Sequence, residues 1–406
     1  MRALFLHRAI RRRVTFMALT ELLWGIGAYL TLVTTTVPAY LRALGASQLL
    51  IGAMATGMVA LPLLPQFFGR TVLDRFPHRK RALIALHVLL ITPYLFIPLA
   101  DKLLTANRPL LITVVISLLA FSQTILGLVI PVWVDMVGQV IPQALHGRYF
   151  GMSAACAAGG GILGGLLLMQ LQRLLGAGAY RLAFAGSGVL YLLAMGAFAL
   201  APIPETAFVH PAEESVWVRL RNALRAVHPR TPFGRLVSSF AAQALASSVI
   251  PFVIVFALDP AGLRYPPAIV GQFTVWQAVG GMLLSFVLGG LVDRIGPRVP
   301  WIAVTTLIPI AMLLALHGFS FWALAAAAVF TGIYGSSWAV SGPAMLSLSP
   351  EGDKSGYIAI ANVAGFLPAA AGPLLIAQII AVHGYIAGFS LAAAAGVVAF
   401  FLALTI

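Results

Sequence analysis

Long apolar stretches separated by short polar segments make up almost the whole of this chain. Twelve of these stretches are long enough to cross the ~30 Å hydrocarbon core of a bilayer as α-helices. The predicted spans cover residues 15–41, 48–73, 82–100, 109–137, 149–172, 182–203, 236–258, 268–292, 300–317, 321–346, 356–382 and 385–405. Because backbone inside a bilayer must satisfy its own hydrogen bonds, the pattern predicts an all-α polytopic membrane protein with 12 transmembrane helices.

Lysine and arginine are divided unequally between the polar segments. With the N-terminus inside, the inner segments hold 19 of the 25 basic residues. The outer segments hold the other six, which are Arg42, Lys102, Arg108, Arg173, Arg181 and Arg264. Cytoplasmic segments of membrane proteins carry such an excess of basic residues. We therefore expect both termini in the cytoplasm and a multi-pass protein of the cytoplasmic (inner) membrane.

The composition indicates a membrane protein independently of the spans. Hydrophobic residues make up 61% of the chain and charged residues 9%, whereas about 25% of residues in soluble domains are charged. The net charge of +14 resides in short loops between apolar stretches, so it indicates topology rather than nucleic-acid binding. The basic segment 1–13 is too polar for the apolar region of a signal peptide, so we expect the first span to be retained.

The longest inner segment, residues 204–235, separates the first six spans from the last six. On a helical projection its apolar arc consists of Val216, Trp217, Leu220, Ala223, Leu224 and Val227. Arg221 and Arg225 lie opposite, which predicts an amphipathic helix on the inner membrane surface. The alternative is a solvated basic loop. The predicted domains are an N-terminal six-helix half (1–203), a cytoplasmic linker (204–235) and a C-terminal six-helix half (236–406).

The two halves repeat one another in sequence. At an offset of 219 residues the equivalent pairs are Ile51 and Val270, Gly52 and Gly271, Phe67 and Phe286, and Asp74 and Asp293. At an offset of 208 they are Pro142 and Pro350, Tyr149 and Tyr357, and Gly164 and Gly372. The repeat predicts two parallel six-helix halves, as many transporters have. The alternative is another twelve-helix membrane protein with a duplicated half.

The loop between the eighth and ninth predicted spans carries a short signature. It reads Gly289-Gly290-Leu291-Val292-Asp293-Arg294-Ile295-Gly296-Pro297-Arg298. A degraded copy runs from Gly69 to Lys80 in the equivalent loop of the first half. Both loops resemble the loop signature of the major facilitator superfamily (MFS), a family of transporters. The resemblance implies the MFS fold, with two parallel six-helix halves and cytoplasmic termini.

The resemblance also implies a role for these loops. In the family, the loop aspartate lies beside the start of a helix of the other half, where backbone N–H groups are free. Asp293 would then lie near Arg148, and Asp74 near the start of the eleventh span. The predicted conformational latch consists of Asp74, Arg75, Arg148, Asp293, Arg294 and Arg298. The alternative is that these charges only set the topology.

Partial marks of drug–proton antiporters within the same family occur in the eleventh span. Gly365 and Gly372-Pro373 resemble the glycine–proline element of those proteins, whereas the equivalent fifth span has glycines at 159–161 and 164–165 but no proline. The alternative for these glycines is packing alone, because small residues let helix backbones approach closely.

Two carboxylates fall inside predicted spans, where they are costly and mark functional sites. Glu21 on the first span and Asp135 on the fourth each lie about 10 Å from the inner edge, at ~1.5 Å per residue. The repeat places Phe240 and Pro343 at the equivalent positions, so the acids belong to the N-terminal half alone. We predict that they bind the coupling proton. The alternative is pairing with Arg13 or Arg148.

The spans lack the residues that a strongly anionic cargo needs. No lysine or arginine lies mid-span, and His87, the one deep histidine, fits a packing role. Since an anion needs a cation to replace its hydration, the spans argue against phosphates and dicarboxylates as cargo. The predicted cavity residues are Trp24, Gln123, Gln243, Ser247, Ser248, Tyr334 and Trp338, with Gln272, Trp276 and Gln277 as further contributors. Each has packing as its alternative role.

The sequence therefore predicts a secondary active transporter of a small neutral or cationic amphipathic solute, with proton-coupled efflux as the main hypothesis. One alternative is a sugar or nucleoside importer or facilitator. Another, from a different class, is a lipid-moving or complex-assembly membrane protein with an MFS-like fold. Without a nucleophile–base motif, a metal-ligand cluster or a phosphate-binding loop, we expect neither an enzyme nor a cofactor. The expected partners are the solute, protons and the lipid bilayer, without nucleic acid, and we expect a monomer.

Overall fold

The structure is a computed structural model that describes residues 8–62, 65, 78–141, 146–203, 228, 230–317, 320–332, 337–348 and 354–406. At some helical positions, among them Asp135, Arg148 and Asp293, the description covers the backbone only. This part of the chain consists of helices, turns and connecting segments, and it contains no strand. The predicted all-α fold class is confirmed.

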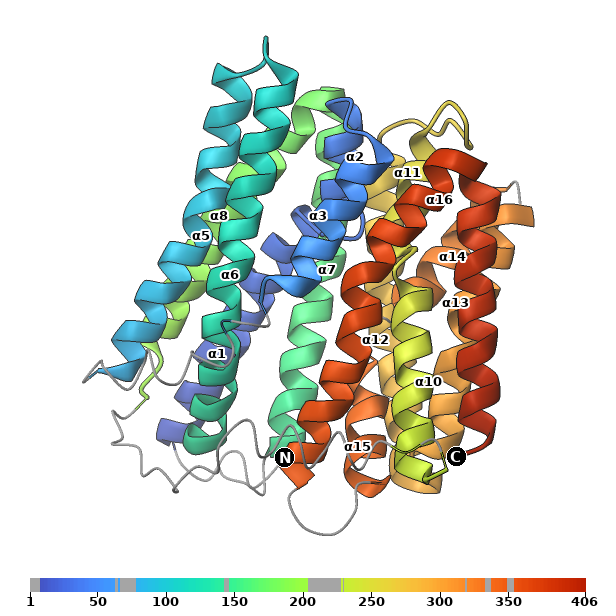
Figure 1. Ribbon diagram of the computed structural model, residues 1–406. Helices are drawn as coiled ribbons and strands as arrows, with labels where there is room; N and C mark the ends of the chain where they lie inside the picture. Colours follow the sequence, from blue (N-terminus) through green and yellow to red (C-terminus); the bar gives the residue numbers. More distant parts are fainter. Residues whose placement is uncertain are drawn as a thin grey trace. The chain divides into compact units, whose positions relative to one another are not determined.

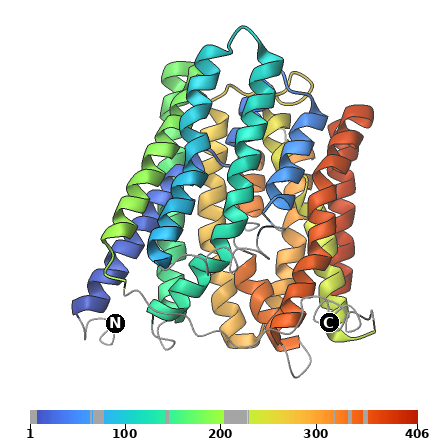
Figure 2. The ribbon, with the colours of Figure 1, turned by 60° about the vertical axis from the view of Figure 1, so that its left-hand side comes forward.

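The predicted spans of the first half contain helices wherever the chain is described (Figure 1). These elements are α1 (Arg8–Leu30), α2 (Thr36–Ala43), α3 (Gln48–Ala60), α5 (Arg79–Leu103), α6 (Arg108–Val140), α7 (His146–Leu175), the short 3-10 helix η3 (Gly176–Gly178) and α8 (Ala179–Leu200). Figure 2 shows α5 and α6 as a long hairpin that folds back through one short loop.

The second half contains a similar series of helices. They are α10 (Pro232–Ser247), α11 (Ile250–Leu258), α12 (Ile269–Ile295), α13 (Arg298–His317), α14 (Phe321–Gly332), α15 (Trp338–Leu348) and α16 (Lys354–Leu404). Within α16, Gly384 has φ 80° and ψ 174°, which is not helical. Glycine adopts a positive φ without the penalty that a Cβ brings. The kink therefore falls at the boundary predicted between the last two spans.

Among the spans whose residues are all described, two are interrupted, which the apolar pattern did not show. The span 15–41 consists of α1 and α2 separated by residues 31–35, and the span 236–258 consists of α10 and α11 separated by residues 248–249. Pro38 and Pro251 lie in the first turns of α2 and α11. Because proline has no N–H and clashes with the carbonyl four residues earlier, both favour an interruption before them, although Pro93, Pro98 and Pro309 lie inside continuous helices.

The described helices have the length and composition of membrane spans. Seven segments are long and apolar enough, namely Lys80–Leu103, Arg108–Ile130, Met152–Leu200, Pro232–Leu258, Ile269–Val292, Arg298–Leu316 and Ala364–Leu404. The third and the last exceed the ~20 residues that one crossing needs. Each of these two contains a turn, at η3 and at Gly384 respectively. The segments Gln48–Ala60 and Phe321–Gly332 are shorter apolar helices.

The chain forms two compact units that do not follow the sequence halves strictly. Unit 1 comprises residues 1–46, 57–208 and 265–275, and unit 2 comprises residues 47–56, 209–264 and 276–406. Helix α3 is thus divided after Thr56 and helix α12 after Val275, two positions that the 219-residue offset makes equivalent. The predicted linker helix and most of the linker lie outside the described residues.

Each unit is centred on one closely packed helix pair. In unit 1 this pair is α1 with α7, and in unit 2 it is α10 with α16, seen side by side in Figure 1. A methyl group at Gly25 would lie 2.3 Å from the Ala157 carbonyl oxygen, and one at Gly160 would lie 2.3 Å from the Leu22 carbonyl oxygen. Backbone therefore meets backbone in the first pair, as small residues allow between membrane helices.

Basic side chains cap the last helix of each sequence half. In unit 1, Lys80 Nζ donates to the carbonyl oxygens of Ala199 and Ala201, both at 2.7 Å. In unit 2, Arg235 donates to the Thr405 carbonyl at 2.6 Å and Arg298 to the Leu404 carbonyl at 3.0 Å. A helix leaves its last four carbonyl groups unsatisfied and carries partial negative charge there. Some of the basic residues that the sequence assigns to the inner segments therefore also stabilise the ends of helices.

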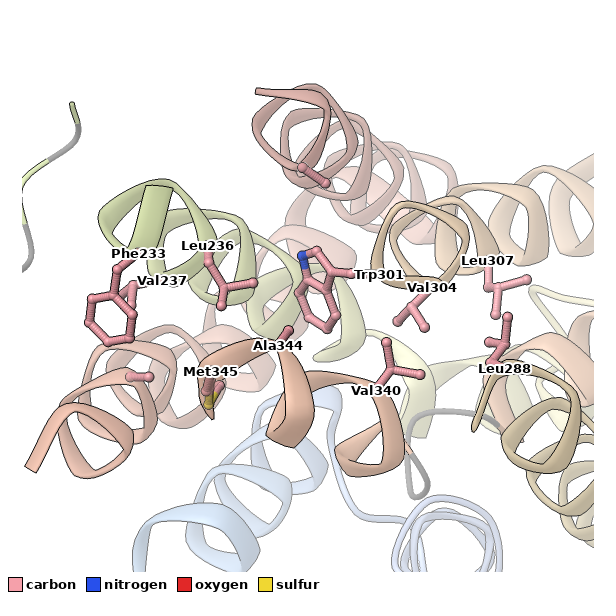
Figure 3. Packing of buried hydrophobic residues seen from close by; sticks show 12 residues of the cluster. Phe233, Leu236, Val237, Leu288, Trp301, Val304, Leu307, Val340, Ala344 and Met345 are labelled. Carbon is pink, nitrogen blue, oxygen red and sulfur yellow. The ribbon is translucent and has the colours of Figure 1, made fainter. Parts of the chain in front are cut away.

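The best-described apolar core lies in unit 2 around Trp301. Figure 3 shows its indole ring beside Leu236 of α10 and Ala344 of α15. The indole N–H donates to the Ser239 hydroxyl at 3.0 Å, and that hydroxyl donates to the Ala399 carbonyl of α16 at 2.8 Å. A buried tryptophan usually finds such a partner, and here it connects α13, α10 and α16.

Candidate functional site: a membrane carboxyl and its surroundings

Glu21 lies on α1 and faces α7. Its carboxyl group is half-buried and lies near the Ser153 hydroxyl, which can donate a hydrogen bond to it. Tyr149 and Cys156, one turn to either side of Ser153, lie close enough to interact electrostatically with the carboxyl group. Among the described residues Glu21 forms no ion pair. The predicted alternative partner Arg13 instead donates to the carbonyl oxygens of Val140 and Pro202.

The tight contact between α1 and α7 positions this carboxyl group. Gly25 lies one turn after Glu21 and touches Ala157, which lies one turn after Ser153. Because the two backbones are in contact there, α1 cannot shift toward α7, and the contact keeps the Glu21 carboxyl group next to α7. Asp135, the second predicted proton site, lies on α6, but its side chain is outside the described part of the chain.

Trp24 lies in an aromatic cluster within unit 1. Its ring is 4.3 Å from the Tyr191 ring of α8 and 5.5 Å, edge to face, from the His87 ring of α5. His87 is buried, and its Nδ1 is 2.8 Å from the Leu83 carbonyl oxygen. Such contacts stabilise helix packing. The structure therefore shows a packing role for Trp24 and His87, and solute contact by Trp24 stays a prediction.

The polar cavity candidates on α6 and α10 are buried. Gln123, Gln243, Ser247 and Ser248 are each less than 10% exposed. Ser247 and Ser248 donate to carbonyl oxygens of their own helix, at Gln243 and Ala244. The Gln243 Oε1 atom is buried without a hydrogen-bond partner in the described structure. Leaving a buried acceptor unpaired costs free energy. A ligand that donates a hydrogen bond to Gln243 would remove this cost, so Gln243 is the strongest candidate here for ligand contact.

The remaining predicted residues are described only in part. Asp74, Arg75 and Tyr334 lie outside the described residues. Arg148, Asp293 and Trp338 occupy helical positions in α7, α12 and α15, but their side chains are not described. Arg294 and Arg298 are exposed, and Arg298 caps α16 within unit 2. The latch therefore stays a prediction.

A polar network in unit 2 was absent from the sequence predictions. The Gln48 amide at the start of α3 donates to the Tyr385 hydroxyl at 2.7 Å, and that hydroxyl donates to the Asp259 carboxylate at 2.9 Å. A methyl group at Gly52 would lie 2.8 Å from the Pro373 carbonyl oxygen. The first part of α3 is thus docked on α11 and α16. We call this set of contacts the α3 dock.

The equivalent segment of α12 is docked in unit 1 by other residues. Thr35 and Thr274 share a hydrogen bond of 2.7 Å, and the Gly271 N–H donates to the Gln172 side chain at 3.0 Å. We call this set the α12 dock. No sequence signal pointed to either dock, because the partners are more than 90 residues apart in the chain. The pairing of Gly52 with Gly271 in the repeat was the one available clue.

Within the described residues no three histidine, cysteine or acidic side chains come together to hold a metal ion.

Comparisons with known proteins identify the fold. No protein-family model and no curated protein sequence matches the chain. Among solved structures, the nucleoside transporter NupG is 13% identical and has a TM-score of 0.68, with 97% of this chain and 98% of that chain covered. A D-xylose–proton symporter is 15% identical and has a TM-score of 0.68, with 98% and 97% covered.

A third similar structure is a POT family transporter in complex with a thioalcohol-conjugated peptide. It is 13% identical and has a TM-score of 0.70, with 97% of this chain and 94% of that chain covered. All three matches extend over nearly the full length of both chains. The chain therefore has the fold of these transporter structures, in agreement with the MFS fold that the loop signature predicted. At such identities the likeness concerns the fold alone, and site chemistry is not transferred.

Proposed function

We propose that this protein is a secondary active transporter that exports a small neutral or cationic amphipathic solute across the cytoplasmic membrane in exchange for protons. The observation that carries the proposal is Glu21. Its carboxyl group is half-buried in a predicted span, lies near the Ser153 hydroxyl, and has no ion-pair partner among the described residues. Ionisable groups held this way in membrane proteins mark proton relays and ion pathways.

The chemistry of the other candidates supports a neutral or cationic solute. Tryptophan and tyrosine faces attract cations and apolar surface, and Gln243 offers a buried acceptor. No lysine or arginine falls in the middle of a predicted span, so a multiply charged anion would lose its hydration without compensation. Asp135 is proposed as the second proton-binding group, at the same predicted depth as Glu21.

Alternating access needs contacts that form in one state and break in the other, because a ligand shifts such an equilibrium only through its differential affinity. We propose the inner loops for this role, with Asp74, Arg75, Arg148, Asp293, Arg294 and Arg298 as the latch. In this proposal both termini are cytoplasmic, residues 204–235 connect the halves, and the protein acts as a monomer.

The second candidate function is import or facilitated diffusion of a sugar or nucleoside. It is favoured by the names of two similar structures, a nucleoside transporter and a D-xylose–proton symporter. A lipid-moving or complex-assembly protein is the candidate from another class. Inward solute accumulation would identify the second function, and co-purified lipid or protein without any solute flux would identify the third.

The test uses purified protein in liposomes with a panel of amphipathic cations, sugars and nucleosides. We expect a pH gradient to drive flux of an amphipathic solute through the wild type. Glu21→Gln should abolish gradient-driven flux and leave solute exchange without a gradient, because exchange needs no net proton movement. The matched control is Phe240→Leu at the equivalent position of the second half, which should keep both activities. Gradient-driven flux at the wild-type level in Glu21→Gln would refute proton coupling through Glu21.

A further inference from the structure

A cavity of about 200 Å³ opens in unit 2 where α10 begins and where α12 and α16 end. Its walls include Leu236, Trp301, Ala344 and Ile406. Leu236 and Trp301 are each 1% exposed, and Figure 3 shows the indole ring beside Leu236 and Ala344. The hydrogen bond from the indole to Ser239 fixes the ring. The back wall is therefore apolar and closed, and a ligand would contact mainly the exposed rim residues Ile295, Arg298 and Ser347.

A positively charged side chain, that of Arg298, lies at the edge of this cavity. Arg298 lines it and is exposed, and one of its terminal nitrogens donates to the Leu404 carbonyl at 3.0 Å. A guanidinium group has five N–H donors, so most of them stay available. Gly296, with φ 81°, makes the turn between α12 and α13 that places Arg298 here. No carboxylate pairs with Arg298 among the described residues.

The cavity adjoins a surface that lipid chains would cover. At the end of α12, Ile295 is both exposed and part of the cavity wall, and Val299, next to Arg298 on α13, is exposed as well. Exposed apolar residues on a membrane helix face acyl chains. The arginine distribution assigns this end of α12 to the cytoplasmic side, so the opening lies where chains meet headgroups in the inner leaflet.

We propose that this cavity is a binding site for a monoanionic membrane amphiphile, whose carboxylate or phosphate pairs with Arg298 and whose first chain segment occupies the cavity. Arginine binds both anions through paired N–H donors. At ~30 Å³ per water the volume corresponds to about seven waters. That volume admits part of one chain and excludes a whole phospholipid, whose remaining chain would lie along α12.

Arg298 also belongs to the proposed latch, so binding at this site is measured directly and without flux. Purified full-length protein in neutral detergent is titrated with phosphatidylglycerol, with phosphatidylcholine and with decanoate, and the melting temperature is recorded. Ligands that bind the folded state raise this temperature. We expect phosphatidylglycerol to raise it and phosphatidylcholine, which has no net charge, to leave it unchanged. A rise with decanoate as well shows that a free fatty acid suffices, and a rise with phosphatidylglycerol alone shows that the phosphate headgroup is needed.

Two variants test the residues. Arg298→Gln should abolish the rise, and Arg230→Gln, which removes the same charge from an exposed position outside the cavity, should retain it. Ser347→Trp fills the cavity from its exposed edge without changing charge, and it should also abolish the rise. If Arg298→Gln does not fold, Ser347→Trp decides alone.

Three results would overturn the proposal. The first is an equal rise for the wild type and Arg298→Gln, and the second is a full rise for Ser347→Trp. The third concerns Glu351 and Asp353, which follow the cavity residue Leu348 in a segment outside the described residues. If the anion stabilises only the double variant Glu351→Gln/Asp353→Asn, these carboxylates neutralise Arg298 in the native protein and no lipid site exists.

Discussion

The pairs α1–α7 and α10–α16 come from equivalent parts of the repeat and hold equivalent places in their units, yet their chemistry differs. In the first pair Glu21 meets Ser153 and backbone meets backbone at Gly25. In the second, the equivalent of Glu21 is Phe240, whose ring lies 2.3 Å from where a methyl group at Gly365 would be. An aromatic ring thus fills the space that a carboxyl group occupies in the first pair.

The difference shows that duplication preserved the packing and not the chemistry. Ala361 replaces Ser153 in the second pair and is fully buried, so no hydroxyl group is present there to bind a carboxylate. A carboxyl group buried without a hydrogen-bond donor is unfavourable. The N-terminal half alone therefore has both the acid and the donor, which is the asymmetry that the proton proposal requires.

The largest expected effect comes from exchanging the two residues. In Glu21→Phe/Phe240→Glu the acid moves to α10, where Ala361 offers it no hydrogen bond. We expect gradient-driven flux to fall to the level of empty liposomes. Addition of Ala361→Ser should restore the fold, measured by the melting temperature, more than it restores flux. Wild-type flux in the exchanged protein would show that the location of the acid in the first pair is unimportant.

A smaller effect separates the two glycine contacts. Gly25→Ala places a methyl group against the Ala157 backbone carbonyl, which cannot rotate away, whereas Gly365→Ala meets the Phe240 ring, which can. Overpacking costs about 1–3 kcal/mol, and we expect Gly25→Ala at or above that range and Gly365→Ala below it. Melting temperatures in detergent test the order. If Phe240→Ala restores the melting temperature of Gly365→Ala, the ring is the obstacle. Equal decreases in melting temperature for Gly25→Ala and Gly365→Ala would contradict the comparison.

The two docks give an intermediate pair of effects. Tyr385→Phe removes the hydrogen bonds to both Gln48 and Asp259, whereas Thr274→Val removes the shared bond with Thr35 and the bond to the Val270 carbonyl. Each bond contributes about 0.5–1.5 kcal/mol, and bonds to charged groups about 1.5–3 kcal/mol. Because Asp259 is a carboxylate, Tyr385→Phe should cost more stability. A cysteine introduced at Leu49, an exposed residue of α3, should then react faster with a thiol reagent in the Tyr385→Phe protein than in the protein that keeps Tyr385. An unchanged rate would show that the α3 dock holds without the Tyr385 hydroxyl.

The smallest expected effects concern the capped helix ends. Lys80→Gln in unit 1 and Arg235→Gln in unit 2 remove one cation each from the ends of α8 and α16. A cation at a helix C-terminus contributes about 0.3–1 kcal/mol and is screened by salt. We expect both variants to melt slightly earlier than the wild type, with the difference shrinking at high salt. Salt-independent losses would assign the effect to packing of the aliphatic stems.

Most of the fold was predictable because its signals are local. Each signal lies within a stretch of about 20 residues, the length of one membrane span. These signals are the length of an apolar stretch, the arginines between stretches and the glycine at the α12–α13 turn. The two helix interruptions were missed for a related reason: an apolar run keeps its hydropathy when Pro38 or Pro251 breaks its backbone. Hydropathy reports the environment of side chains, and the interruption concerns backbone hydrogen bonds.

The sequence by itself determined the class of protein. The length needed to cross the bilayer and the free-energy cost of placing a charge inside it constrain each segment separately. It also identified Glu21 as unusual, since a carboxyl group in a span is rare whatever surrounds it. Only the tertiary structure decided that Glu21 meets Ser153, that Trp24 packs with His87 and Tyr191, and that Gln48 reaches Tyr385. These contacts join residues from distant parts of the chain. Their geometry depends on how closely two backbones approach, which glycines such as Gly25 and Gly52 permit but do not specify.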